Sequence, residues 1–148
     1  MILIWYHYIR IKEQSEMKLI TRDTDYALRA ICFIARHNKE IVTADELVRG
    51  LKIPRPFLRK ILQVLNKKKV LKSQKGQGGG FLLAMPAARL FLVNLMEIFQ
   101  GPLNLNECFF KKRVCPNTDT CALRRKITHI EKYVIKELKS ITIASLLR

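Results

Sequence analysis

Acidic residues are scarce in this chain. Its 148 residues contain 12 Asp and Glu against 28 Lys and Arg, which gives a formal net charge of +16. A surface field of that sign favours polyanions, and nucleic acid is the first candidate partner. A basic protein of membrane surfaces is the competing interpretation.

Long apolar runs and enzyme motifs are also missing. The stretch LFLVNLMEIF at 90–99 is far too short to span a bilayer and contains Asn94 and Glu97. No paired carboxylates, Ser-His-Asp set or nucleotide motif is recognisable, and the Gly-rich KGQGGG at 75–80 lacks the Lys-Ser/Thr pair of a phosphate loop. We therefore expect neither a membrane-spanning protein nor an enzyme.

The first sixteen residues differ from the rest. The segment MILIWYHYIRIKEQSE has as many acidic as basic residues and lacks the basic start and small-residue cleavage site of a signal peptide. We expect a cytoplasmic, reducing compartment, in which clustered cysteines indicate metal or redox chemistry. Codons for Lys12-Glu13 can form a ribosome-binding purine run, so 1–16 is interpreted as an extension before a start at Met17. A genuine N-terminal arm is the alternative.

Two helices are expected first in the part that follows. Apolar residues recur at helical spacing in TDYALRAICFIARHN, 24–38, with Thr24 as the expected cap and Cys32 as a small core residue. Thr43 and Glu46 have the spacing of a capping box, which predicts a short helix that stops near Gly50.

A basic helix and a hairpin should follow. In KIPRPFLRKILQVLNKKK, 52–69, Pro54 and Pro56 suit a turn and a first helical turn, and the face between the apolar positions is basic. Two short helices joined by a tight turn predict a helix-turn-helix. Segments 70–73 and 81–84 can pair across the glycines as a wing.

Charge supports a DNA contact at these elements. Between Arg49 and Lys75 there are ten basic residues and no acidic one. A solvated face is the ordinary explanation of such a run, but here the run coincides with the helix and wing that would touch DNA. Glycines in the wing would let backbone N–H groups approach phosphate or a narrow minor groove.

The C-terminal part predicts two more helices. Residues 90–100 should form one that ends at Gly101-Pro102. Apolar residues at 123, 127, 130, 134, 138 and 141 then predict a long helix with one narrow apolar seam. Because little of the chain is left to cover this seam, we expect it to pair with a second copy; packing within the chain is the alternative. Thr142 is expected to cap a last short turn.

Three cysteines lie between these helices. Cys108, Cys115 and Cys121 have the spacing C-x6-C-x5-C, which lacks the C-x2-C knuckles and the fourth thiol of many structural zinc sites. Thiolates in longer loops with a non-cysteine fourth ligand suit an iron–sulfur cluster, and the surrounding lysines and arginines would offset its charge. Zinc, a thiol redox switch and inert thiols remain open. The chemistry leaves the fourth ligand open among His129, Glu107, Asp119 and a group from a second chain.

Several motifs together resemble the Rrf2 family of bacterial winged-helix regulators, of the IscR and NsrR type. They are MKLITRDTDYALRA at 17–30, IPRPFLRKILQVLNKKKVLKSQKGQGGGFLLAMP at 53–86, IFQGPL at 98–103, and the cysteine trio before the long helix. The wing KGQGGGFLL is similar to the family pattern R-G-x-G-G-G-[YF]-x-L.

The resemblance implies a mainly α fold: a winged helix-turn-helix at 17–86, a linking helix and cysteine loop at 87–121, and a dimerisation helix with a final turn at 122–148. It implies a cytoplasmic homodimer that reads palindromic double-stranded DNA and holds an iron–sulfur cluster that senses cluster status, nitric oxide, iron or redox state. A cluster-free thiol switch, or an adaptor that controls a biosynthetic enzyme, is the alternative. The expected DNA contacts are Thr43, Arg55, Pro56, Phe57, Arg59, Lys60, Lys75, Gln77 and Gly78.

The resemblance also bears on the cluster ligands. It assigns Cys108, Cys115 and Cys121 to the cluster, but Arg124 stands where IscR-like members have a histidine, which favours 4Fe-4S over 2Fe-2S. NsrR-like members can use the aspartate of a TD-x-ALR motif from the opposite subunit, which makes Asp25 the expected fourth ligand and Asp23 a weaker alternative. A carboxylate that simply suits a helix start is the competing explanation of Asp25.

Overall fold

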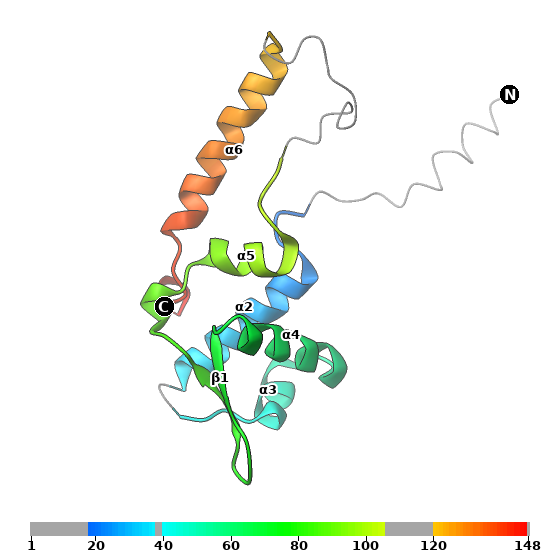
Figure 1. Ribbon diagram of the computed structural model, residues 1–148, viewed down its shortest axis with the longest axis vertical. Coiled ribbons are helices and arrows are strands. Elements are labelled where there is room, and N and C mark those ends of the chain that lie inside the picture. The colour runs from blue at the N-terminus through cyan, green and yellow to red at the C-terminus, as the bar shows by residue number, and fades with distance from the viewer. Residues whose placement is uncertain (1–17, 38–39, 106–119, 148) are drawn as a thin grey trace, which may run out of the picture.

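The structure is a computed structural model that describes residues 18–37, 40–105 and 120–147. The N-terminal segment 1–17, and the segment 106–119 with Cys108 and Cys115, lie outside the described residues. Helices dominate the fold, and a two-stranded antiparallel sheet projects from the lower end of the molecule (Figure 1). The elements are α2 (Arg22–Arg36), α3 (Ala44–Leu51), α4 (Arg55–Lys67), β1 (Leu71–Gln74), β2 (Gly80–Leu83), α5 (Leu92–Gln100) and α6 (Ala122–Ser140), with short 3-10 turns at Ala87–Arg89 and Ala144–Leu146.

Helix α2 begins earlier than the sequence predicted. The prediction that Thr24 caps this helix is wrong. Thr21 is the N-cap, and its Oγ1 accepts a hydrogen bond from the Thr24 backbone N at 3.4 Å. Thr24 is fully buried, and its hydroxyl donates to Gln100 Oε1 at 2.8 Å. A buried hydroxyl needs such a partner, and here the partner lies on another helix.

Gln100, the last residue of α5, fastens that helix to the start of α2. Its Oε1 also accepts from the Thr21 backbone N at 3.1 Å, and its Nε2 donates to the Leu19 carbonyl at 2.9 Å. One side chain therefore satisfies three groups at the start of α2, where helical N–H groups have no partner of their own. We call these contacts the Gln100 clasp.

Replacement of Gln100 with Ala is expected to lower the free energy of unfolding by about 1–3 kcal/mol, because three groups at the start of α2 lose their hydrogen bonds to Gln100. Urea titration of the purified protein measures this change. Gln63→Ala, at an exposed helical position of α4, is the matched control and should stay within about 0.5 kcal/mol. Equal stability of the two variants would contradict a structural role for the clasp.

Helices α3 and α4 form the predicted helix-turn-helix. The capping box at the start of α3 is present: the Thr43 backbone N donates to Glu46 Oε2 at 2.7 Å and the Glu46 N donates to Thr43 Oγ1 at 3.2 Å. The bond from the Thr43 backbone holds the pKa of Glu46 below its usual value. The ionised Glu46 side chain therefore stabilises the fold at pH values above the ordinary carboxyl pKa. This stabilisation is lost as the pH falls through the pKa of Glu46 in the folded protein.

The core of this domain comes from one face of each helix. Helix α4 follows Pro54 and has Pro56 in its first turn, as predicted. Apolar residues at its helical spacing are buried against α2 and α3, whereas Phe57, which the pattern also placed in the stripe, is exposed. The buried members are Leu58, Ile61, Leu62 and Leu65.

The hairpin also forms, one residue away from the predicted bounds. Leu71 pairs with Leu83, and Ser73 pairs with Phe81. Phe81 exchanges two further backbone hydrogen bonds with Val42, at 3.0 and 2.8 Å, so β2 is paired on both sides. A Cβ on Gly80 would lie 2.4 Å from the Val42 carbonyl oxygen, which explains why glycine stands there.

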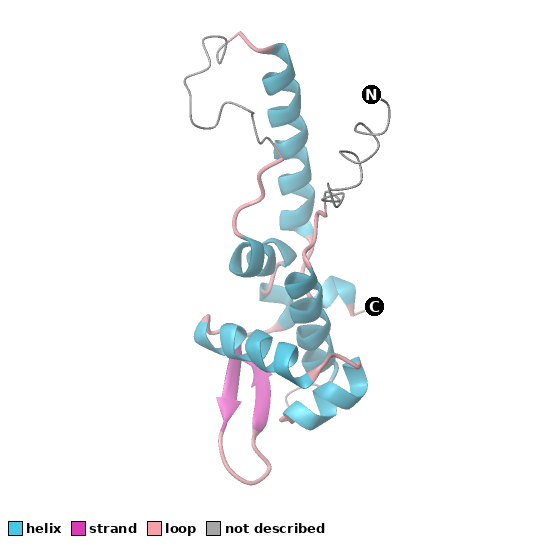
Figure 2. Ribbon diagram, turned by 90° about the vertical axis from the view of Figure 1, so that its right-hand side faces the viewer, coloured by secondary structure: helices cyan, strands magenta, loops and turns pink. Residues whose placement is uncertain are grey.

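Helix α6 extends away from the winged-helix body (Figures 1 and 2). Near its C-terminal end, Val134 and Leu138 pack with residues of α5. Along the helix before Val134, Leu123, Ile130 and Tyr133 are 70%, 50% and 61% exposed. The predicted long helix is thus confirmed, and two positions of its apolar seam, Leu123 and Ile130, are exposed in the described chain. No helix in the described ranges is long and apolar enough to cross a membrane.

Candidate nucleic-acid interface and cluster ligands

Helix α4 presents its predicted contact residues to solvent. Residues 55, 56, 57, 59 and 60 are all exposed, and α4 contains no acidic residue. The position follows from the packing, because burial of the apolar stripe turns the basic face outward. Thr43 differs from this group: it is half-buried, and its hydroxyl donates to Glu46 Oε2 at 2.8 Å, so its first role is to cap α3.

An ion pair that the sequence did not reveal joins the two helices of the motif. Arg55 donates through its guanidinium to Asp45 Oδ1 in the first turn of α3. Both side chains are more than half exposed. A surface pair of this kind contributes little to stability, so DNA phosphate can compete with Asp45 for Arg55. The sequence feature that could have indicated this ion pair is Asp45, an acidic residue in the first turn of the helix that precedes the basic helix α4.

A groove of about 440 Å³ runs beside α4. The polar side chains along it are Arg55, Arg59 and Gln63, and its apolar part comes from α3, α4 and Phe81 of β2. Positive groups on an apolar floor, next to the hairpin, suit an anionic and partly apolar surface such as the edge of a DNA groove.

The tip of the hairpin is exposed at Lys75, Gln77 and Gly78. Gly76 and Gly78 have φ values of 103° and 77°, which favour glycine over residues with a Cβ. The tip therefore combines one cation and one amide with a backbone that has little side-chain cover.

Cys121 is the predicted cysteine ligand that the described residues include. It is the N-cap of α6, half-exposed, and its Sγ accepts from the Arg124 backbone N at 3.4 Å. The sulfur thus lies at the N-terminal end of α6, the positive end of the helix dipole. The expected ligands Cys108 and Cys115 lie outside the described residues.

Asp25 lies in the first turn of α2, where its Oδ2 is 2.9 Å from Nε of Arg29. Cys121 is at the far end of α6, and both views show this end well removed from α2 (Figures 1 and 2). Asp25 and Cys121 of one chain are therefore not brought together. Across the described ranges no group of three metal-binding side chains is assembled.

Residues 20–148 match the Rrf2 family, described as an iron-dependent transcriptional regulator. The chain belongs to the Rrf2 family. It is a transcriptional regulator with a DNA-binding winged helix. This confirms the prediction made from the sequence patterns of the helix-turn-helix and the wing.

Curated Rrf2 relatives are similar along most of the chain. A helix-turn-helix transcriptional regulator of Aquifex aeolicus is 29% identical over 124 residues, which cover 82% of this chain and 86% of that protein. The transcriptional regulator NsrR of Oceanobacillus iheyensis is 28% identical over 127 residues, 84% of this chain and 86% of NsrR.

Solved structures share the fold. CymR, the global cysteine regulator of B. subtilis, superposes with a TM-score of 0.75 at 19% identity and covers 88% of this chain and 97% of its own. IscR of T. potens gives a TM-score of 0.68 at 20% identity, with 88% and 87% covered.

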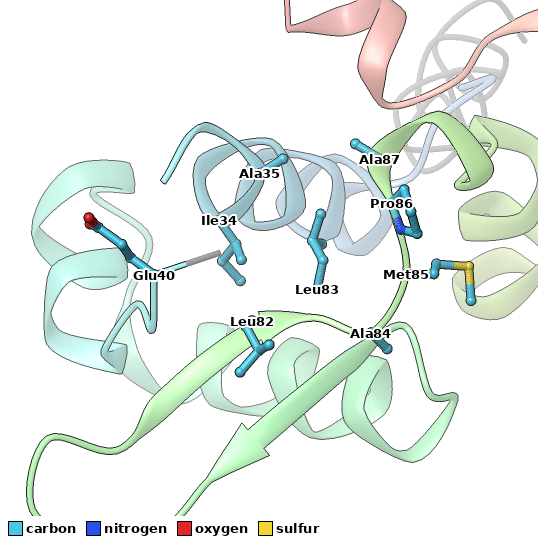
Figure 3. Close-up of a pocket in the computed structure, with 9 residues that line it drawn as sticks. All are labelled: Ile34, Ala35, Glu40, Leu82, Leu83, Ala84, Met85, Pro86 and Ala87. Carbon is cyan, nitrogen blue, oxygen red and sulfur yellow. The ribbon is translucent and has the colours of Figure 1, made fainter. Parts of the chain in front are cut away.

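Two other features of this Rrf2 protein have plainer roles. Cys32 is half-buried against the core, as predicted, and burial raises the pKa of its thiol. A second groove, of about 400 Å³, lies between the end of α2 and the segment after β2 (Figure 3). Glu40 is the one charged residue in its lining, which is otherwise apolar, so it does not suit an anion such as DNA.

Proposed function

We propose that this Rrf2 regulator binds palindromic DNA as a homodimer and that an iron–sulfur cluster controls the binding. The observation that carries the proposal is the exposed basic face of α4 beside the hairpin. In the same chain, the Gln100 clasp fastens the end of α5, which leads to the cysteines, to the start of α2. The contacts on α4 are Arg55, Pro56, Phe57, Arg59 and Lys60; those on the hairpin are Lys75, Gln77 and Gly78; and Thr43 lies at the start of α3.

The donor set fits a cluster. Cys121 offers a half-exposed sulfur at a helix N-terminus, and Cys108 and Cys115 supply two further thiols of the same segment. Such a cluster, when bound, supplies iron that reacts with oxidants and nitric oxide. Asp25 of a second copy is the proposed fourth ligand, since Asp25 and Cys121 of one chain lie apart and Arg124 offers no ligand. We favour 4Fe-4S over 2Fe-2S for that reason.

The dimer rests on the uncovered seam of α6. Leu123 and Ile130 of the seam are exposed, as is the neighbouring Tyr133, and a second copy of α6 would remove them from water. Two copies of α4 would then face two half-sites of DNA. The distance between the two copies of α4 must match the distance between the two half-sites. A cluster with ligands from both chains would fix that distance.

The test is DNA binding by the full chain, purified without oxygen, before and after removal of iron. A duplex is first selected from a random pool, and Kd is then measured over a range of salt concentrations. We expect brown protein whose affinity changes when iron is removed. Equal affinity of both forms at every salt concentration would overturn control by the cluster. Colourless protein with thiol-dependent binding would favour the thiol switch.

A mixed dimer tests whether Asp25 acts between chains. Co-expressed Asp25→Asn and Cys121→Ser chains, each with its own tag, should retain about half the iron of wild type, because one site keeps a complete ligand set. Wild type paired with a chain that carries both substitutions should retain almost none. The opposite pattern would place Asp25 and the cysteines of one chain in the same site.

A further inference from the structure

One exposed aromatic ring stands out on the reading surface. Phe57 is 47% exposed, and among α2, α3, α4 and the hairpin, all of which the structure describes, no other large apolar side chain is so open to water. It is not one of the apolar residues that pack against the core. The ring therefore contributes less to the core than a buried phenylalanine would.

The helix holds this ring in a defined place. Phe57 is the third residue of α4, and its backbone N donates to the Pro54 carbonyl at 3.0 Å. Pro56 precedes it in the first helical turn and restricts the backbone further. Lys60, three residues on, is its neighbour on the same face of the helix. A ring fixed beside a cation can meet a surface that is anionic at its edge and partly apolar within.

Charge decides which kind of partner can bind at the surface around Phe57. From Arg49 to Lys75 the chain has no acidic residue, so a second copy of this basic face would be repelled, whereas a polyanion would be attracted. A phenyl ring cannot hydrogen-bond to phosphate or to a base edge. The apolar group that the major groove offers is the C5-methyl of thymine.

We propose that Phe57 reads thymine in each half-site by contact with its C5-methyl group. The inference rests on the proposed DNA binding and deepens it. Phe57 is then a residue that determines specificity, whereas Lys60 beside it supplies the phosphate contact that is independent of sequence.

Deoxyuridine isolates this contact, because it differs from thymidine only by the missing methyl group. Each thymine of the selected duplex is replaced singly, and Kd is measured at fixed salt concentration with the full chain. One position in each half-site should lose affinity by about threefold to fivefold, the size expected for one buried methyl group. Phe57→Ala should bind the thymine and uracil duplexes equally.

Two controls keep the test sharp. Met85→Ala removes another exposed apolar side chain, outside the helix-turn-helix, and should keep the sensitivity to uracil. Circular dichroism of Phe57→Ala should match wild type, because the ring is not packed in the core.

A random pool from which no duplex is enriched would overturn the proposed function itself.

An enriched duplex without a uracil-sensitive thymine would overturn only the assignment of Phe57. So would a Phe57→Ala variant that keeps the full sensitivity to uracil. If that variant lost affinity equally on every sequence, the ring would contact sugar and phosphate or act as a wedge between base steps.

Discussion

Iron is expected to be almost absent from protein in which Cys121 is replaced with Ser. Serine is a favoured N-cap, so α6 should keep its first turn while the cluster site loses a thiolate. This makes the substitution sharper than alanine, which would remove the cap and the ligand together. The measurement is iron and acid-labile sulfide per chain after purification without oxygen.

The matched control is Cys32→Ser. Cys32 lies half-buried against the core, and burial raises the pKa of its thiol, so it is poorly suited to bind iron as a thiolate. Iron content should match wild type. Full iron in Cys121→Ser, or a comparable loss in Cys32→Ser, would show that the assigned cysteines do not form the site.

Replacement of Arg59 with Ala should weaken binding to the selected duplex by about 1–3 kcal/mol. Arg59 is exposed on α4 beside the groove, and a guanidinium favours guanine through paired hydrogen bonds. Kd on a panel of single-base variants is the measurement, and discrimination should relax at one position.

Arg89→Ala is the control for charge. It removes an exposed arginine from the turn after the hairpin, outside α4. Its effect should be small and the same on every sequence. If Arg59→Ala lost affinity equally across the whole panel, Arg59 would contact phosphate rather than a base edge.

The elements of the DNA-binding domain were predictable because their signals are local. The capping box, the prolines before α4 and the glycines of the wing each act within a few residues. The start of α2 was misplaced because Thr21 and Thr24 are both suitable caps, and the choice depends on Gln100, 76 residues after Thr24. The pairing of Val42 with Phe81 and the ion pair of Asp45 with Arg55 are likewise contacts between elements, which periodicity does not encode.

The candidate site was predictable to a different extent. The spacing of the cysteines favoured an iron–sulfur site, the family resemblance assigned the three thiols and Asp25 as its ligands, and all four remain predictions. A site completed by a second chain has no signature in one sequence, because neither half shows a full ligand set. On α4, sequence identified the basic face, whereas the isolation of Phe57 from the core required the structure.

The Gln100 clasp has a consequence for how the chain folds and how it can be cut. It joins residues 76 to 81 positions apart, so the start of α2 gains these three hydrogen bonds only when α5 is in place. A fragment that ends at residue 86 would contain every DNA contact proposed for this chain and would still lack the three hydrogen bonds of Gln100. We therefore expect such a fragment to be less stable than the full chain, because the helix that leads to the cysteines also supports the start of α2.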